Sequence, residues 1–493
     1  MNRREFLKSV GALSASLQVG DAAAALAGTQ PVVNDIHSQL NRTAVDEVVR
    51  PRTVAELADV LRRARKRGRA VSVAGGRHAM GGQQFARGSI HVDTRDLAQV
   101  IRFDRARGHL EVEAGIQWPA LVRHYLDTQQ NEAKPWGFVQ KQTGADRFTI
   151  GGSLGANAHG RVLTRKPMIA DVESFRIMDA TGEVRTCSRG ENPELFRLAI
   201  GGYGLFGIMT AATLRLVPRR KVERVVEMMN VDELMPAFES RIGDGFEFGD
   251  CQFSIDPASS EFLKRGVFSC YRPIEQDRPI PEDQKRLSDD NWRTLLLLAH
   301  TDKKEGFERY AKYYLSTTGQ LYWSDLHQMS TYLDDYHVAL DKQLGAKVEG
   351  SEMISELYVP RPKLADFMSA AAEELRRRAV DVIYGTIRLI EADDECFLAW
   401  AKQSYACVIF NLHTEHSSQG LEKSAQAFRS LIDLARARGG SYFLTYHRWA
   451  TREQVDACYP QFREFMKKKR EFDPDERFQS EWWRHQKRLF GTT

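Results

Sequence analysis

The chain has 493 residues, of which 42% are hydrophobic and 28% charged, and its formal net charge is +4. At about 150 residues per domain, this length suggests two or three domains, and the composition is ordinary for a globular protein whose core needs no disulfides. A charge of +4 spread over a mixed surface argues against nucleic-acid binding, which requires a clustered basic face. No apolar run reaches the roughly 18 residues of a membrane-spanning helix, so we expect no transmembrane segment.

The first residues resemble an export signal. The stretch N-R-R-E-F-L-K at residues 2–8 is typical of a twin-arginine motif, a mildly apolar segment follows to Leu26, and alanines at 23, 25 and 27 offer cleavage sites. The alternative is an ordinary basic N-terminus. We predict a signal peptide over residues 1–28 and a periplasmic or extracytoplasmic location. Because this route carries folded proteins, it suits an enzyme that loads a cofactor in the cytoplasm.

Six cysteines lie at positions 187, 251, 270, 396, 407 and 458. No two of them have a C-x-x-C spacing, and none forms a Cys/His cluster with the spacing of zinc ligands. We therefore predict no metal site from the sequence. We interpret the cysteines as small buried apolar residues, and one incidental disulfide is the alternative.

Helix and strand patterns alternate up to about residue 218. A capping box of Thr53 and Glu56, followed by an apolar stripe, predicts an amphipathic helix over residues 53–68, with Gly68 as its stop. In chain order we then predict strands over 70–74, 90–92, 100–103 and 110–114, a helix over 120–126 opened by Pro119, strands over 169–179 and 182–187, a short helix over 195–199, and a strand over 209–217.

After residue 218 the sequence changes in character. Glycine becomes rarer, and amphipathic patterns predict long helices over 364–378 and 421–438, with strands over 382–390 and 407–413 between them. No repeat period or low-complexity segment is visible. These patterns indicate an α+β fold, with a glycine-punctuated first domain and a second α+β domain on the substrate side.

Three glycine clusters interrupt the first domain, over residues 75–82, 143–160 and 201–208. A loop can approach a pyrophosphate closely only where side chains are absent, and its N–H groups can then bind phosphate oxygens. Each cluster alone is a weak signal, because turns are rich in glycine. No G-x-G-x-x-G follows the first strand, so a Rossmann site is disfavoured.

Together, the order and spacing of these clusters resemble the FAD domain of the vanillyl-alcohol oxidase and para-cresol methylhydroxylase (PCMH) family. The matching segments are a strand and glycine loop with a histidine (74–82), T-I-G-G…H-G (149–160) and G-x-x-G-x-x-G-I (201–208). The resemblance implies a two-part PCMH-type FAD-binding domain over residues 45–218, an α+β substrate or cap domain over 219–445, and a C-terminal segment, 446–493, that returns over the flavin. It implies that FAD is bound by Ala74, Gly75, Gly76, Arg77, His78, Ala79, Met80, Gly81, Gly144, Thr149, Gly151, Gly152, Ala156, His159, Gly160 and Ile208.

Two histidines in these loops have further implied roles. In covalent members of the family, a histidine at the place of His78 is bonded to the flavin 8α-methyl carbon, so we predict that link; the alternative is a hydrogen bond to a phosphate or to backbone. A second, cysteinyl link is not expected, because residues 145–147 are A-D-R. His159 lies near the flavin ring in similar proteins, or else anchors the backbone of its turn.

The C-terminal third resembles the closing segment of sugar and aldonolactone oxidases and of decaprenylphosphoryl-ribose oxidase, through Tyr459-Pro460, F-D-P-D at 472–475, and R-L-F at 488–490. Several of those proteins place a lysine facing the flavin where this chain has Tyr446, beside His447. Arg388 lies on a predicted strand and shares a face with Thr386, which stands where alditol-oxidase-like proteins have a glutamate. We predict Arg388, Tyr446 and His447 as catalytic residues; packing in the domain interface and a structural ion pair are the alternatives.

The implied activity is oxidation of a CH–OH group in a sugar-, alditol- or lactone-like alcohol, with hydride transfer to flavin N5 and electrons passed on to dioxygen, a quinone or a protein acceptor. Arg388 would hold a substrate oxygen, and Tyr446 or His447 would assist removal of the hydroxyl proton. Two other functions stay open: a flavin-dependent reductase of the same fold, and a flavin-binding subunit without catalysis.

Overall fold

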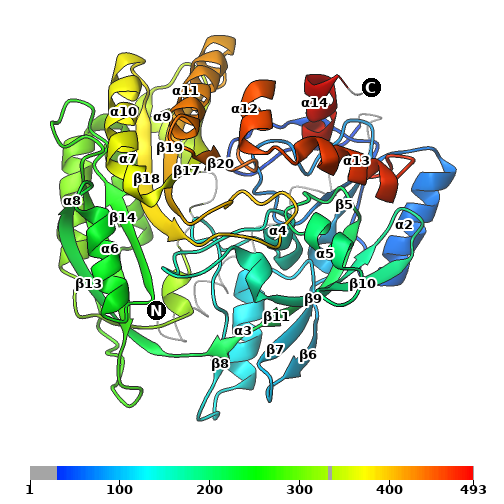
Figure 1. The fold of residues 1–493 in the computed structure, drawn as a ribbon, viewed down its shortest axis with the longest axis horizontal. Helices are drawn as coiled ribbons and strands as arrows, with labels where there is room; N and C mark the ends of the chain where they lie inside the picture. The colour runs from blue at the N-terminus through cyan, green and yellow to red at the C-terminus, as the bar shows by residue number, and fades with distance from the viewer. Residues whose placement is uncertain (1–29, 331–332, 334–335, 492–493) are drawn as a thin grey trace.

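The computed structural model describes residues 30–330, 333 and 336–491, so the predicted export signal lies outside the described residues. The fold is α+β, as expected, and Figure 1 shows two groups of strands. The strands of the first 218 residues lie together, and a larger sheet built from later residues lies beside them under its own helices. One continuous apolar core joins the two groups.

A small parallel sheet opens the first group, in the order β3 (Glu47–Val49), β5 (Ile90–Asp93) and β4 (Val71–Ala74). Helix α2 (Val54–Lys66) buries its apolar stripe against it. Thr53 caps this helix by accepting a hydrogen bond from the Glu56 amide at 3.1 Å, and Gly68 follows its end with φ +62°. The predicted helix and its two end signals are therefore present.

An antiparallel sheet of five strands completes the first group, in the order β10 (Val184–Ser188), β9 (Val172–Met178), β11 (Ile208–Arg215), β7 (His109–Glu113) and β6 (Val100–Asp104). The strand predicted over 169–179 begins only at residue 172, because residues 168–171 form a turn of 3₁₀ helix after Pro167. Two helices flank this sheet, α3 (Trp118–Thr128) and α5 (Pro193–Ala199). The glycine-rich segment that we expected as a loop includes a short helix, α4 (Ile150–Gly155), capped by Thr149.

The second group is an antiparallel sheet of eight strands. Its order is β16 (Leu321–Trp323), β13 (Lys221–Asn230), β15 (Arg265–Pro273), β14 (Phe248–Phe253), β18 (Val382–Ile390), β19 (Tyr405–Glu415), β17 (Gly350–Pro360) and β20 (Ser441–Tyr442). The predicted strands over 382–390 and 407–413 are its central β18 and β19.

The two faces of this sheet differ in chemistry. Helices α10 (Leu364–Arg377) and α11 (Ser418–Arg436) cover the face formed by rows such as Leu357, Val408 and Ile387, which are fully buried. Because strand side chains alternate, the next residues point the other way, and they form the row Glu356, Ile409 and Thr386. The face that α10 and α11 do not cover is therefore more polar, and it lies toward the first group of strands.

The last residues return to the first group. After α12 (Arg452–Cys458) and α13 (Phe462–Phe472), the amide of Val71 in β4 donates to the Arg477 carbonyl at 2.7 Å, and the Gln479 amide donates to the Val71 carbonyl at 2.9 Å. Helix α14 (Glu481–Phe490) ends the described chain. The remaining elements are β1 (Val32–Val33), β2 (Thr43–Ala44), β8 (Trp136–Gly137), β12 (Val217–Pro218), α6 (Leu234–Gly243), α7 (Asp289–Thr301), α8 (Lys303–Leu315) and α9 (Tyr336–Leu344).

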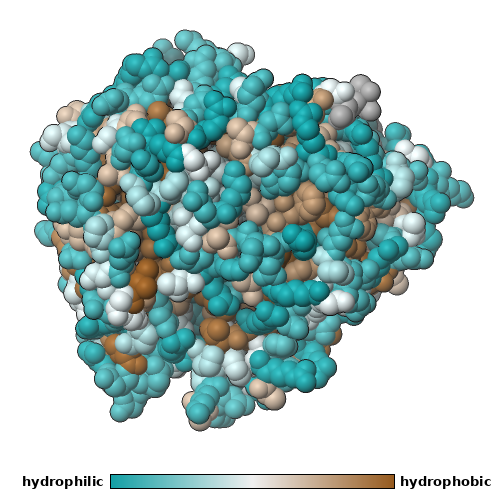
Figure 2. All heavy atoms as spheres, in the orientation of Figure 1, coloured by the Kyte–Doolittle hydropathy of each residue, from teal (hydrophilic) through white to brown (hydrophobic). Residues whose placement is uncertain are grey.

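Many apolar residues are buried in the core, and the surface is accordingly rich in polar side chains (Figure 2). The face in Figure 2 is mostly hydrophilic, with apolar side chains in separate patches. All six cysteines are buried and unpaired. Across residues 30–330, 333 and 336–491, no helix is both long and apolar enough to cross a membrane.

Candidate cofactor and substrate site

A pocket lies between the two groups of strands. The loop after β4, helix α4, the turn before β11 and the segment 443–446 form its walls. The predicted cofactor residues that line it are Ala74, Gly75, Gly76, Arg77, His78, Ala79, Met80, Gly144, Thr149, Gly151, Gly152, Ala156 and Ile208.

Close backbone packing explains the glycines of this pocket. A Cβ on Gly75 would overlap the Thr149 hydroxyl and lie 2.7 Å from Thr149 Cγ2, so the loop after β4 and the start of α4 can meet only without a side chain there. A Cβ on Gly151 would lie 3.0 Å from that of Ala114. Arg77 adopts φ +60°, a left-handed conformation that a non-glycine residue takes at a cost. The chain segments pack so closely at these glycines that backbone, and not side chains, forms the pocket wall.

The pocket offers two kinds of surface. Glycine backbone forms the walls at residues 75–76 and 151–152, where no side chain blocks the approach of a ligand. The amides of Gly151 and Gly152 donate to the Ala114 carbonyl and the Thr149 hydroxyl. Phe148, Ile177 and Met209 add apolar wall. A group with a pyrophosphate and a broad planar ring fits such a lining, which is the combination that FAD presents.

His78 lies in the pocket wall inside an aromatic environment. Its Nδ1 is 2.8 Å from His37 Nε2, and its ring centroid is 4.1 Å from that of Phe148. Burial, and then the neighbouring His37, lower the pKa of His78 well below its ordinary value. The imidazole is therefore neutral at physiological pH, the form in which a ring nitrogen keeps its lone pair.

Three of the predicted cofactor residues do not line the pocket. The Gly81 amide donates to Gln83 Oε1 within a tight turn, and the Gly160 amide donates to Gln140 Oε1 of a distant segment, so both amides bond within the protein itself. His159 is buried beside Trp400 with ring centroids 5.1 Å apart and points to the sheet of the second group. Its neighbour Ala158 lines the pocket instead.

His159 forms the edge of a buried polar cluster that the sequence analysis missed. Its Nε2 lies 2.6 Å from Glu356 Oε1, while its Nδ1 lies 3.1 Å from the Gly160 carbonyl oxygen. The Tyr358 hydroxyl and the Cys407 thiol donate to the same Glu356 oxygen. Burial raises the pKa of Glu356, but His159, the Tyr358 hydroxyl and the charge of Arg388 outweigh it and hold that pKa below its ordinary value. Glu356 is therefore a carboxylate at neutral pH.

The second oxygen of the Glu356 carboxylate, Oε2, lies in a different environment from Oε1. Glu356 Oε2 is buried and has no hydrogen-bond partner among the residues that the structure describes. Glu356 lies two residues along β17 from Ile354, which lines the pocket, and the two side chains share a face of the sheet. A buried carboxylate oxygen that its surroundings leave unpaired is suited to accept a hydrogen bond or a proton from a ligand.

Arg388 lies on the same polar face of the sheet. Its Nη2 donates to the Thr143 hydroxyl at 2.6 Å, whereas Nε and Nη1 are buried without a partner in the described part of the chain. The hydroxyl of Thr386, on the same face of β18, is also buried and unpaired there. The guanidinium thus keeps two of its donor groups available for a ligand oxygen.

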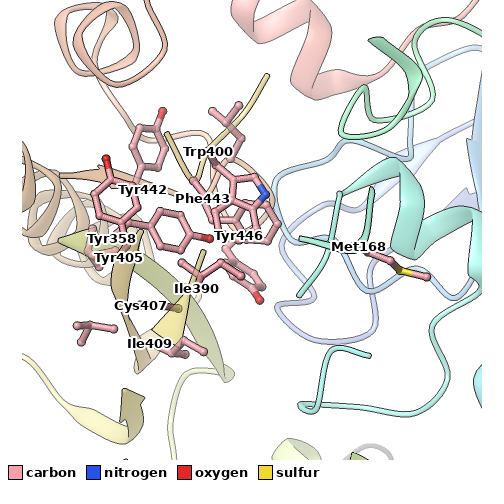
Figure 3. Close-up of a cluster of buried hydrophobic side chains, with 14 of the residues drawn as sticks. Met168, Tyr358, Ile390, Trp400, Tyr405, Cys407, Ile409, Tyr442, Phe443 and Tyr446 are labelled. Atoms are coloured by element: carbon pink, nitrogen blue, oxygen red, sulfur yellow. The ribbon is translucent and has the colours of Figure 1, made fainter. Parts of the chain in front are cut away.

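Tyr446 connects the pocket with this polar face. It lines the pocket and belongs to a cluster of aromatic side chains with Tyr358, Trp400 and Phe443, with Cys407 on the neighbouring strand (Figure 3). Burial, and then the charge of Glu356, raise the pKa of the Tyr446 hydroxyl well above its ordinary value. Tyr446 stays protonated near neutral pH, so it can position an oxygen but is a poor base.

His447 is turned away from the pocket, contrary to the catalytic role predicted for it. Its ring is stacked on Phe428 of α11 at 4.5 Å and on Trp449 at 5.6 Å, and it is not among the pocket-lining residues. The chain turns at residues 444–446, and Thr445 and Tyr446 line the pocket whereas His447 does not. Burial lowers the pKa of His447 to about 3. Its surroundings fit the alternative of interface packing.

Comparison with known proteins agrees with this geometry. Residues 45–188 match the FAD binding domain family. The L-gulono-1,4-lactone dehydrogenase of Mycobacterium tuberculosis strain H37Rv is 24% identical over 445 residues, which is 90% of this chain and 96% of that protein. The rice cytokinin dehydrogenase 4 is 31% identical over 195 residues, 38% of this chain and 36% of its own. An uncharacterized oxidoreductase of the fasciation locus of Rhodococcoides fascians is 32% identical over 169 residues, 34% of this chain and 37% of its own.

The pocket and the matching domain define a flavoprotein that binds FAD. The chain is similar to FAD-linked oxidoreductases of the vanillyl-alcohol oxidase and para-cresol methylhydroxylase type, and these similarities support an FAD-dependent oxidoreductase.

Proposed function

We propose that this enzyme oxidises a CH–OH group of a sugar-, alditol- or lactone-like alcohol. The observation that carries the proposal is the polar sheet face beside the cofactor pocket, where Glu356 Oε2 and two guanidinium nitrogens of Arg388 are buried without partners among the described residues. Buried polar groups nearly always have hydrogen-bond partners. A substrate with several hydroxyl or carbonyl oxygens would supply them, whereas an apolar substrate would leave the carboxylate and guanidinium unpaired.

Similarity over nearly the whole chain supports a substrate of this class. The relative matched over 90% of the chain is named for dehydrogenation of a lactone, L-gulono-1,4-lactone. Cytokinin dehydrogenase 4 matches only 38% of the chain, so its similarity carries less weight for the substrate.

The roles of the residues follow from their charge and protonation. Bound FAD would supply the hydride acceptor that oxidation of the substrate carbon requires. Arg388 binds substrate oxygens through its Nε–H or its Nη1–H group, while the bond from Nη2 to Thr143 fixes the guanidinium. Glu356 accepts the hydroxyl proton at Oε2 and thereby takes the role that we predicted for Tyr446 or His447. Tyr446 donates a hydrogen bond that orients the substrate oxygen.

The cofactor assignment includes a covalent attachment through His78, supported by its neutral imidazole in the pocket wall and by the positioning contact with His37. Denaturation with acid tests it: flavin absorbance that stays with the precipitated wild type and moves to the supernatant in His78→Ala supports the link. Wild-type flavin that is released by acid contradicts it.

We further propose the predicted domain boundaries and export by residues 1–28. Electrons would pass to dioxygen, a quinone or a protein. The export proposal predicts that the full chain accumulates in the periplasm and that Arg3→Lys combined with Arg4→Lys keeps it in the cytoplasm. Equal distribution of the two proteins would contradict it.

The test of the proposed substrate class is anaerobic reduction of the bound flavin. Purified protein should show absorbance near about 370 and 450 nm, and L-gulono-1,4-lactone, aldoses and alditols should be added separately under anaerobic conditions. Bleaching near 450 nm by one of these, but not by benzylic alcohols, supports the proposal. Bleaching only by NADPH would favour a reductase, and no bleaching by any donor would favour a non-catalytic flavoprotein.

A further inference from the structure

A second buried cluster lies on the same sheet face but outside the proposed catalytic groups. It joins His300 at the end of α7, Glu352 in β17 and His413 in β19. Glu352 Oε1 lies 3.3 Å from His300 Nε2 and 3.5 Å from His413 Nδ1. The side chains of His300 and Glu352 are each only 4% exposed. Within the described residues, all three of these atoms are buried without a hydrogen-bond partner.

The spacing of these atoms is that of ligands around one metal ion. Zinc binds nitrogen and oxygen at about 2.0–2.1 Å with tetrahedral angles, so two of its ligand atoms lie about 3.3–3.4 Å apart. The two distances from Glu352 Oε1, 3.3 and 3.5 Å, match that separation. The two imidazole rings are nearly perpendicular, at 87°, and all three atoms lie within 4.8 Å of one another.

The cluster of His159, Glu356 and Cys407 provides an internal comparison. It also contains three possible ligand atoms, but its His159 Nε2 to Glu356 Oε1 distance is 2.6 Å, which is a hydrogen bond and too short for two ligands of one zinc ion. Cys407 likewise donates a hydrogen bond to Glu356. The first cluster is thus closed by a short hydrogen bond, whereas in the second the two histidine nitrogens lie at ion-pair distance from Glu352 Oε1, 3.3 and 3.5 Å, without hydrogen-bond geometry.

The surroundings of the second cluster complete the pattern of a metal site. The other carboxylate oxygen, Glu352 Oε2, accepts a hydrogen bond from the Tyr336 hydroxyl. Metal ligands are commonly oriented by such a hydrogen bond from a neighbouring residue. Gly350 leaves space for the His413 ring, because a Cβ there would lie 2.9 Å from His413 Nε2. The His413 side chain is 20% exposed, which provides a path for an ion.

We propose that His300, Glu352 and His413 bind one divalent transition-metal ion, with Zn²⁺ as the best match. Two histidines and a glutamate are borderline ligands that suit zinc and its neighbours rather than magnesium or calcium. Three protein ligands leave a fourth position for water or a substrate oxygen. Glu352 lies about 7 Å along the strand from the pocket-lining Ile354, so the ion would sit beside the cofactor pocket. The proposal does not depend on the substrate class proposed above.

Metal titration of the holoenzyme tests the proposal directly. The full protein, with any affinity tag removed, is treated with a chelator, dialysed, and titrated with ZnCl₂ by calorimetry. We expect one equivalent to bind to the wild type and the affinity to fall at least 100-fold in His300→Ala and in His413→Ala. The matched control is His416→Ala, since His416 lies near the cluster but bonds Ser351 and is not a ligand; its affinity should match the wild type. Equal affinity in all four proteins, or no binding to the wild type, would overturn the site.

Cobalt keeps the test decisive if a variant fails to fold. Co²⁺ added to the wild type should give visible bands at longer wavelength than flavin absorption, with the intensity of four- or five-coordinate cobalt and saturation at one equivalent. The bands should disappear when Zn²⁺ is added. Only the weak spectrum of hydrated, six-coordinate Co²⁺ would overturn the proposal even if no variant could be purified.

Discussion

The cofactor pocket and the polar sheet face beside it are built in opposite ways. The pocket wall is largely backbone, brought close by glycines such as Gly75 and Gly151, whose neighbours leave no space for a side chain. The polar face consists of side chains, and strand register brings Glu356, Ile409 and Thr386 into one row. A constant cofactor can be held by backbone atoms, whereas the groups that select a substrate are side chains that can change without altering the fold.

Gly75→Ala should have the largest effect, because it disrupts the pocket itself. The new Cβ would overlap the Thr149 hydroxyl, and overpacking of this kind costs about 1–3 kcal/mol and displaces backbone. We expect the purified variant to retain less than about a tenth of the wild-type flavin absorbance. Gly190→Ala is the control, since a Cβ there has no atom within 4 Å. Full flavin content in Gly75→Ala would show that the loop can move without losing the cofactor.

Glu356→Gln should affect turnover while leaving the pocket intact. The amide cannot take a proton at the position of Oε2, and loss of a general base typically lowers the rate about 10²–10⁴-fold. We expect kcat to fall by that factor while the flavin spectrum and melting temperature stay close to the wild type. Glu422→Gln, on the exposed side of α11, serves as the control. A kcat within a factor of two of the wild type would remove Glu356 from the mechanism.

Arg388→Lys should act mainly on substrate binding. Lysine keeps the charge but loses the planar fork that binds Thr143 and leaves two nitrogens for a ligand. Loss of one charge-assisted hydrogen bond corresponds to about 1.5–3 kcal/mol, so we expect KM to rise about 10- to 100-fold. Steady-state kinetics with the best alcohol donor would measure it. A fall in kcat at unchanged KM would place Arg388 in the transition state instead.

His447→Phe should have the smallest effect on activity and a measurable one on acid stability. The pKa of His447 is about 3 in the folded protein, against about 6.5 when unfolded, so only the unfolded chain binds the proton between these values. Folding stability therefore falls as pH decreases from about 6.5 toward 3, by about 1.4 kcal/mol per pH unit from this residue. The phenylalanine variant should remove that contribution.

Denaturant unfolding at pH 7.5 and 5.0 measures this difference. The variant should lose less stability on acidification than the wild type, though not become independent of pH, because His91 has a folded pKa of about 4 and contributes the same slope in both proteins. Activity at pH 7.5 should be unchanged. A loss of more than about tenfold would restore the catalytic role that the sequence predicted for His447.

The elements that could be predicted well from the sequence are those fixed by residues close to one another in the chain. The helix after Thr53 is fixed by its cap and apolar stripe, and the glycine loops are fixed by short-range conformational needs, so both could be read from neighbouring residues. The short helix α4 was missed because three of its six residues are glycine, which disfavours helix, and packing against Ala114 overrides that preference.

The substrate side was predicted less completely because its residues meet only through strand pairing. Glu356 lies in β17, a strand that was not predicted, although apolar Met353, Leu357 and Val359 alternate with the polar face. The period of two could have indicated the strand, but not that Glu356 would reach His159, since that contact joins the two groups of strands. The catalytic role was predicted for His447 for a similar reason, because neighbouring residues do not show which side of the segment faces the pocket.

The two backbone hydrogen bonds between Val71 and the residues around Phe478 tie the end of the chain to one of its first strands. Translation must therefore be nearly finished before that strand acquires its last neighbour, and Tyr446 reaches the pocket only in the same late stage. A chain that ended before residue 446 would lack part of the pocket wall as well as both bonds to β4, so only a nearly complete chain can form the whole cofactor pocket.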